Sequence, residues 1–80
     1  MSEPAQRLVR CFRAVFPDLP NEAIPGASVA TMPQWDSLAM VTLVALLERE
    51  FAITIDPMDI VECDSFEAIN DYLRDRGALA

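Results

Sequence analysis

The chain has 80 residues with thirteen acidic side chains, six arginines, no lysine and no histidine, which gives a formal net charge of −7 at pH 7. The length indicates one domain, and the excess of acid argues against nucleic acid and anionic membrane surfaces as partners. Without histidine or lysine the chain lacks the usual base for a serine or cysteine nucleophile and the amine for Schiff-base chemistry, so we expect a binding or carrier module and not an enzyme.

The first predicted helix runs from about Glu3 to Phe16. An acid and a proline suit its first turn, and apolar residues recur at helical spacing on one side. The residues expected in the core are Leu8, Phe12, Val15 and Phe16. The other side carries Arg7, Arg10 and Arg13, which form either a docking stripe or a solvated face that balances acids elsewhere.

A long connection follows at residues 17–35. Its four prolines forbid a continuous helix. Since long connections in small domains usually pack or function, we expect an ordered loop with its apolar side chains on the core and one helical turn near Asn21–Ile24. Trp35 closes this segment; it either pins the loop or helps to select binding partners, and the pattern alone does not decide between the two.

The second predicted helix begins at Asp36 or Ser37, ends near Phe51, and contains neither glycine nor proline. Projection at 100° per residue separates two apolar surfaces. The core face comprises Met40, Leu43, Val44, Leu47 and Phe51. The smaller outer stripe comprises Leu38, Val41 and Ala45. Periodicity leaves two readings of this stripe, an exposed interaction surface or a surface covered by the long loop.

Residues 51–55 alternate like a strand, but no second strand is predicted to pair with them. We therefore expect an extended connector that brings Ile53 and Ile55 into the core. Asp56 with a following proline predicts the start of a short third helix, roughly Pro57–Val61.

A fourth helix is predicted after Asp64 or Ser65, either of which suits its N-cap. Gly77 ends it in the manner of a C′ glycine. Its apolar face comprises Phe66, Ile69, Tyr72 and Leu73. Together the elements predict one all-α domain over residues 1–80, with three main helices, one short helix and a long first loop.

The sequence argues against metal binding and secretion. Cys11 and Cys63 are far apart and form no CxxC, so no metal site is expected. Asp56 and Glu67 have the spacing of the end ligands of an EF-hand, but apolar residues occupy the ligand and glycine positions between them. The N-terminus lacks an apolar signal core, and the apolar run at 38–47 is too short to span a bilayer, so we expect a cytoplasmic protein.

Ser37 lies at the start of the second helix, between Asp36 and Leu38. Asp and Ser are common capping residues, so helix capping alone explains the pair. The free N–H groups and dipole of a helix N-terminus also favour an anion there, such as a phosphate esterified to Ser37. Because this chain offers no base to activate the hydroxyl, another protein would have to modify it.

Two stretches of the chain resemble the acyl carrier protein family of phosphopantetheine-binding carriers. They are WDSLAMVTLVALLEREFAITIDPMDI (Trp35–Ile60) and SFEAINDYL (Ser65–Leu73). The resemblance is strongest from residue 36 onward, and it implies an all-α, four-helix carrier-protein bundle in which Ser37 receives 4′-phosphopantetheine from coenzyme A, with Asp36 beside it. It also implies that a separate, Mg²⁺-dependent phosphopantetheinyl transferase attaches the arm, whose thiol then holds acyl groups as thioesters.

The resemblance also implies where partners bind. In the family the second helix and its flanking loops contact partner enzymes, many of which are basic there. The positions that this implies here are Leu38, Val41 and Ala45, with Glu48 and Asp56 as charged contacts. The expected partners are the transferase and acyl-loading and acyl-using enzymes with basic or mixed apolar surfaces, and the carrier is expected to be a monomer.

Departures from the family pattern narrow the choice of biosynthetic pathway. Many fatty-acid carriers have acids two and five residues after the serine, where this chain has Ala39 and Thr42, and a small residue where it has Trp35. We therefore expect a stand-alone carrier in polyketide or other specialised acyl biosynthesis. The runner-up is a peptidyl or aminoacyl carrier, although residues 33–35 lack the usual Gly-Gly or Gly-His element. A third alternative is not a carrier at all but a small acidic helical adaptor protein without a prosthetic group.

Overall fold

The computed structural model describes residues 3–78 of the chain. Its helices are α1 (Glu3–Val15), the 3₁₀ helix η1 (Asn21–Gly26), α2 (Ser37–Phe51), α3 (Pro57–Ile60) and α4 (Phe66–Asp75). Over this range there is no strand, only an isolated bridge between Ser28 and Ser65. The all-α prediction of three main helices and one short helix is confirmed. α1 and α3 each end one residue earlier than predicted, and η1 extends the predicted turn in the loop by two residues.

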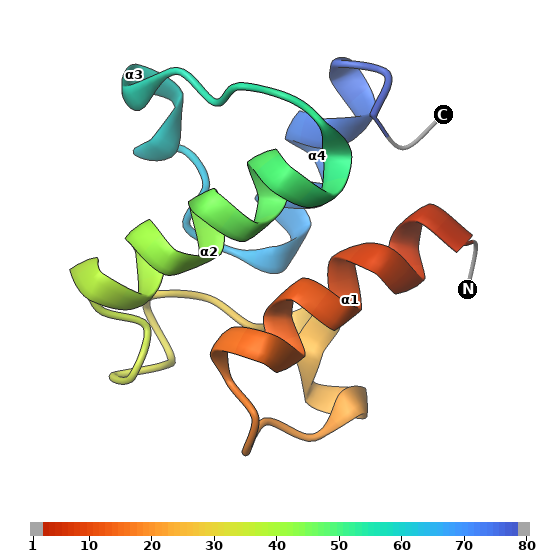
Figure 1. Cartoon of the computed structure of the whole chain (residues 1–80). Helices are drawn as coiled ribbons and strands as arrows, with labels where there is room; N and C mark the ends of the chain where they lie inside the picture. Colours follow the sequence, from red (N-terminus) through yellow and green to blue (C-terminus); the bar gives the residue numbers. More distant parts are fainter. Residues whose placement is uncertain (1–2, 79–80) are drawn as a thin grey trace.

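The helices pack on both sides of α2. Figure 1 shows α1 and α2 side by side and running in opposite directions, with α3 on the other side of α2 in this view. The 3₁₀ helix η1, in the long loop, contacts both α1 and α4. The loop is thus part of the packed structure, as its apolar residues predict, although Val29, which was also expected on the core, is 40% exposed.

A single apolar core joins these elements. Its completely or almost completely buried side chains include Leu8, Phe12, Ile24, Leu43, Leu47, Ile69 and Leu73. Burial of such a side chain contributes roughly 1.5–3 kcal/mol relative to leaving it in water. Three residues predicted for the core faces, Val15, Met40 and Tyr72, are half-buried at its edge.

Side-chain caps begin three of the helices. The Asp36 carboxylate accepts a hydrogen bond from the Ala39 N–H at 2.9 Å at the start of α2. At the start of α3, Asp56 accepts from the Met58 N–H at 2.9 Å, and Ser65 caps α4. The sequence left two candidates for the first and last of these caps, and the structure selects Asp36 and Ser65.

The C-terminal end of α4 is closed by Gly77, as predicted. Gly77 has φ +75°, and its N–H donates to the carbonyl of Arg74 at 3.0 Å. The next N–H, of Ala78, donates to the carbonyl of Leu73 at 2.9 Å. This pair of bonds is the Schellman arrangement, which needs a left-handed residue where glycine is least strained.

Backbone hydrogen bonds attach the long first loop to the segment between α3 and α4. The Val29 N–H donates to the carbonyl of Asp64 at 2.8 Å, and the Phe66 N–H donates to the carbonyl of Ala27 at 2.9 Å. These bonds hold residues 27–29 beside the start of α4. They join residues that are more than thirty positions apart in the sequence, and periodicity cannot predict such a contact.

The segment after α2 is an extended connector, as expected. Ala52 ends the helix in the left-handed conformation, with φ 53° and ψ 46°. Ile55 is buried, Ile53 is half-buried, and the Ile55 N–H donates to the Glu48 carboxylate at 2.8 Å. The connector is therefore held against the helix that precedes it.

Candidate functional site

Ser37 is the first residue of α2, and its side chain is exposed. The neighbouring Asp36 supplies the cap, so the fold does not require the serine for that role. Among the hydrogen bonds of residues 3–78, none uses the Ser37 hydroxyl. The hydroxyl is therefore accessible and chemically unengaged at the end of a helix.

Trp35 holds the chain just before this serine. Its side chain is only 2% exposed, and its ring lies 5.4 Å from that of Phe12 and 5.6 Å from that of Phe16. The indole thus anchors the end of the long loop on α1, while Asp36 and Ser37 remain at the surface. The structure supports loop anchoring for the residue that the sequence left unexplained.

A cleft of about 530 Å³ lies beside Ser37. Besides Ser37 it is lined by Val29, Trp35, Asp36, Met40, Val41, Ile60, Val61 and Asp64. We call this the Ser37 cleft. Its walls come from the long loop, the first turns of α2, the end of α3 and the segment after α3, and they are mostly apolar. A flexible group attached to Ser37 would have an apolar surface next to it.

Exposed apolar side chains surround this region. Leu38 and Val41 on the outer side of α2 are 76% and 66% exposed, and Ala45 is exposed too. Of the two readings that periodicity left open, the structure therefore supports the exposed surface, because the long loop does not cover the side chains of Leu38 and Val41. Single exposed apolar residues are common, but a group of them marks an interaction surface.

Sequence analysis missed the contribution of α3. Met58 and Val61 are 82% and 79% exposed, and Val61 lines the Ser37 cleft. These two residues are three apart, so they share one face of a helical segment. That spacing is the signal that would have indicated a second apolar surface opposite the stripe of α2.

The two acidic residues expected at the interface have structural roles. Glu48 is half-buried, and its carboxylate accepts the Ile55 N–H at 2.8 Å. Asp56 is exposed and caps α3. The Asp56 charge is accessible to a partner, whereas the Glu48 carboxylate is already engaged within the fold.

The two cysteines are free, buried and outside the Ser37 cleft. Burial raises the pKa of both thiols, and nearby acids raise it further, Glu50 for Cys11 and Asp59 for Cys63. A thiol with a raised pKa is mostly protonated at neutral pH and is a poor nucleophile. Neither cysteine is therefore a candidate reactive group.

Within residues 3–78 no group of three or more metal-binding side chains comes together. In the same range no helix has the length and apolar character needed to cross a membrane.

Comparison with known proteins gives one match. Residues 35–73 match the family described as the phosphopantetheine attachment site. The matched segment begins at Trp35, contains Ser37 and the exposed stripe of α2, and ends at the last buried residue of α4. No curated protein and no solved structure matches the chain.

Proposed function

The chain belongs to the phosphopantetheine attachment-site family of carrier proteins, and on this premise we propose that Ser37 is the residue that bears the 4′-phosphopantetheine. Membership makes the protein a non-catalytic carrier and implies a phosphopantetheinyl transferase as a partner. The observation that supports Ser37 is its exposed hydroxyl, which has no partner among the described residues and lies inside the matched segment.

The residues around Ser37 fit a phosphodiester. In the described part of the chain, the Asp36 carboxylate accepts the N–H of Ala39, whereas the N–H groups of Ser37 and Leu38 donate to no partner. Free N–H groups and the helix dipole favour an anion by about 0.3–1 kcal/mol at an exposed site. When bound, the group supplies a terminal thiol that holds cargo as a thioester. The adaptor alternative, which has no prosthetic group, loses its support.

The pathway is proposed from the surface of α2. Thr42 donates its hydroxyl to the carbonyl of Leu38 at 3.0 Å, and Ala39 is half-buried, so neither position offers an acid to a partner. The accessible surface there is the apolar stripe Leu38, Val41 and Ala45. We propose that partner enzymes bind it through mixed apolar contacts, with Asp56 and Glu48 near its edges. This supports a carrier for polyketide or other specialised acyl groups.

The cysteines and the core support proposals for the compartment, the domain count and the oligomeric state. The two free, buried cysteines support a reducing compartment such as the cytosol. The single core supports one carrier domain over the whole chain, which we propose acts as a monomer.

The experiment is an intact-mass measurement. The purified protein is incubated with coenzyme A, Mg²⁺ and a phosphopantetheinyl transferase of broad specificity. We expect the mass to rise by one phosphopantetheine, the Ser37→Ala variant to gain nothing, and the Ser28→Ala variant to gain as much as the wild type. Ser28 is the matched control because it precedes the cleft in the loop and its hydroxyl is bonded to that of Thr31 at 3.0 Å.

Failure of the wild type with several transferases, or modification of Ser37→Ala, would contradict the attachment proposal. Protein purified from its native host tests the pathway. An acyl group on the arm supports the proposed pathway, and an aminoacyl group supports the peptidyl alternative instead.

A further inference from the structure

Few contacts hold α3 to the rest of the protein. None of its residues is buried, and Ile60 alone among them packs at the edge of the core. On either side of the helix, Ile55 and Cys63 are 4% and 1% exposed, so the core fixes both ends of the segment at residues 56–62. We call these residues the α3 segment. Because a segment with few buried apolar contacts opens more easily than the core does, its position depends on polar contacts.

Backbone hydrogen bonds stabilise the α3 segment internally. The N–H groups of residues 59, 60, 62 and 63 donate to carbonyls three or four positions earlier in the chain. Within residues 3–78, every hydrogen bond that reaches from the α3 segment to a distant part of the chain ends on a single carboxylate, that of Asp59. The polar link between α3 and the other helices therefore depends on one side chain.

The Asp59 carboxylate accepts two hydrogen bonds from the C-terminal end of α4. The Tyr72 hydroxyl donates to Asp59 Oδ2 at 3.0 Å, and the Arg76 guanidinium donates to the same oxygen at 2.9 Å. The guanidinium carbon of Arg76 also lies 4.6 Å from the centre of the Tyr72 ring, so the two donors contact each other. Hydrogen bonds to an ionised acceptor are stronger than those between neutral groups. We call these three residues the Asp59 cluster.

Tyr72 connects the Asp59 cluster to the core. Desolvation, followed by the hydrogen bond to Asp59, raises the pKa of Tyr72 above its ordinary value of 10.0, so the hydroxyl keeps its proton and donates at neutral pH. The next residue, Leu73, is completely buried. The donor therefore comes from a helix that is itself fixed in the core.

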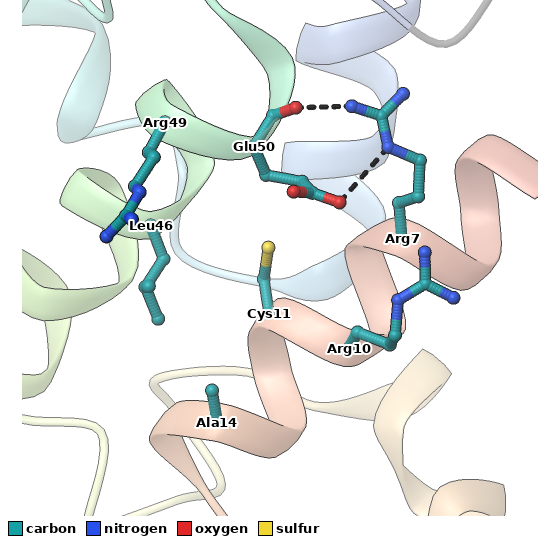
Figure 2. Close-up of a pocket in the computed structure, with 7 residues that line it drawn as sticks. All are labelled: Arg7, Arg10, Cys11, Ala14, Leu46, Arg49 and Glu50. Carbon is teal, nitrogen blue, oxygen red and sulfur yellow. Dashed lines mark hydrogen bonds and ion pairs between the residues drawn. The ribbon is translucent and has the colours of Figure 1, made fainter.

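The connection between α1 and α2 is built differently. Figure 2 shows Arg7 of α1 reaching Glu50 near the end of α2, where its guanidinium bonds both the carboxylate, at 3.2 Å, and the main-chain carbonyl. Leu8 of α1 and Leu47 of α2 are buried in the same core. Loss of the Arg7–Glu50 pair would leave this packing in place. Loss of the Asp59 cluster would leave α3 with only the edge contact of Ile60.

The α3 segment forms a wall of the Ser37 cleft. Ile60 and Val61 line the cleft from this segment, and Met40 and Val41 line it from α2. A movement of α3 would therefore change the width of the cleft. We propose that the Asp59 cluster positions α3 as a wall of the Ser37 cleft, and that a break in this cluster opens the cleft to solvent while the other helices stay packed.

The consequence for cargo rests on the attachment proposed at Ser37. An apolar group carried there would find a narrow apolar cleft while the Asp59 cluster is intact, and a wider, wetter one when the cluster is broken. The three residues of the cluster do not line the cleft. They act on it through α3 and are positioning residues.

The first test measures hydrogen exchange in the unmodified full chain by NMR spectroscopy. Asp59→Ala removes the acceptor of both bonds, and alanine does not lower the helix propensity of α3. We expect the amides of Glu62 and Cys63 to exchange about tenfold faster in this variant, since two hydrogen bonds to a charged acceptor are lost. Tyr72→Phe, which removes one donor and keeps the ring, should accelerate the same amides by a smaller factor.

Exchange in urea separates local opening from unfolding of the whole protein. Local opening exposes little surface, so urea below the unfolding transition should leave the exchange of Glu62 and Cys63 unchanged. It should accelerate exchange of the Leu47 amide, because Leu47 is buried in the core. The same urea dependence for all three amides would show that the cluster only stabilises the whole fold, and the proposal would be wrong.

Glu50→Ala is the matched control. It also removes an acid that joins two helices through an arginine, but at a place outside the Ser37 cleft. We expect it to leave the exchange of Glu62 and Cys63 at the wild-type rate. Wild-type exchange in Asp59→Ala, or equal acceleration by Glu50→Ala, would overturn the proposal. Circular dichroism checks that the variants are folded, and Tyr72→Phe supplies the milder change should Asp59→Ala unfold.

The second test reports on the cleft itself. The uncharged dye acrylodan, whose emission moves to shorter wavelength in apolar surroundings, is attached to Ser37→Cys at neutral pH, and the intact mass confirms a single addition. We expect a shorter emission wavelength than for the same dye on Ala23→Cys, an exposed position of η1 outside the cleft. Adding Asp59→Ala should move the emission towards that of Ala23→Cys, and adding Glu50→Ala should leave it unchanged.

The two tests are independent of the attachment experiment. Neither uses phosphopantetheine, so failure of a transferase to modify Ser37 would leave both results standing. If Asp59→Ala accelerates exchange and leaves the emission unchanged, α3 moves without opening the cleft, and the proposed role of the Asp59 cluster is wrong.

Discussion

The indole ring of Trp35 meets the ring of Phe12 edge-on, with ring centres 5.4 Å apart and planes at 83°. Phe12 also contacts Phe16 and Phe66, at 6.2 and 5.2 Å between centres. Edge-on aromatic pairs contribute about 0.5–1.5 kcal/mol beyond the area they bury. The residue just before Asp36 and Ser37 is therefore part of the central aromatic cluster, and it couples the position of the proposed site to the core.

Replacing Trp35 should lower stability strongly. We expect Trp35→Ala to reduce the free energy of unfolding by about 3–5 kcal/mol, because it leaves a large cavity. Trp35→Phe should cost clearly less. It keeps an aromatic ring and removes the indole N–H, which is buried without a partner among the described residues and carries a penalty of about 1–3 kcal/mol. Urea unfolding followed by circular dichroism measures both, and equal losses for the two variants would contradict this account.

Charge on the exposed stripe should affect partners and spare the fold. Val41 is 66% exposed, so Val41→Asp should change the free energy of unfolding by no more than about 0.5 kcal/mol. It should slow acyl transfer to or from partner enzymes, because the introduced carboxylate opposes apolar contact. Ala23→Asp, which adds the same charge at an exposed position of η1, is the control for transfer. A large loss of helicity in Val41→Asp would instead place Val41 in the core.

The left-handed residue after α2 offers a stabilising substitution. Ala52 has φ 53°, a conformation in which a Cβ is strained and glycine is not. Ala52→Gly should raise the free energy of unfolding by up to about 1 kcal/mol, the gain being limited by the greater freedom of glycine in the unfolded chain.

The matched control for Ala52→Gly is Ala45→Gly, which makes the same chemical change at an exposed position in the middle of α2. This variant should lose about 0.5–1 kcal/mol, since glycine weakens a helix interior. Thermal unfolding of the two variants should therefore shift in opposite directions. A loss of stability in both would show that Ala52 is not strained.

The buried thiols should make stability depend on alkaline pH. Burial raises the pKa of Cys11 and Cys63 in the folded protein above the ordinary value of 9.0. The unfolded chain therefore loses these protons first. The stability from the neutral buried thiols is fully present below the unfolded pKa and is lost as pH rises through that value towards the folded pKa.

Alkylation with iodoacetamide offers a direct measurement of these thiols. At pH 8 we expect slow modification of the folded protein and rapid modification in urea, because the reagent needs an accessible thiolate. The variant Cys11→Ala identifies the signal of Cys63, and the variant Cys63→Ala identifies the signal of Cys11. Fast alkylation of the folded wild type would contradict the burial of these residues.

Local signals in the sequence predicted most of the helical framework. The cap at Asp36, the period of α2 and the glycine after α4 each act within a few residues, so they can be read from a short window. The projection of α2 also placed Leu38 and Val41 on the side of the helix away from the core face. What the projection could not decide was whether the loop covered them, since that depends on packing.

Contacts between distant residues were beyond prediction. Glu48 was expected to face partners, but its carboxylate binds the backbone of Ile55 across a left-handed turn that no residue type announces. The pairing of Arg7 with Glu50 joins residues 43 apart in the sequence. The burial of Trp35 depends on the rings of α1, and a loop has no period from which its buried side can be inferred.

The capping of α2 by Asp36, and not by the serine next to it, bears on whether folding or modification comes first. Because no hydrogen bond described for the fold draws on the Ser37 hydroxyl, the newly made polypeptide can reach its final shape before anything is attached to it. A loading enzyme would then meet a finished surface and would not need to capture the chain during synthesis. A cell could keep a reserve of empty, fully folded molecules and charge them only on demand.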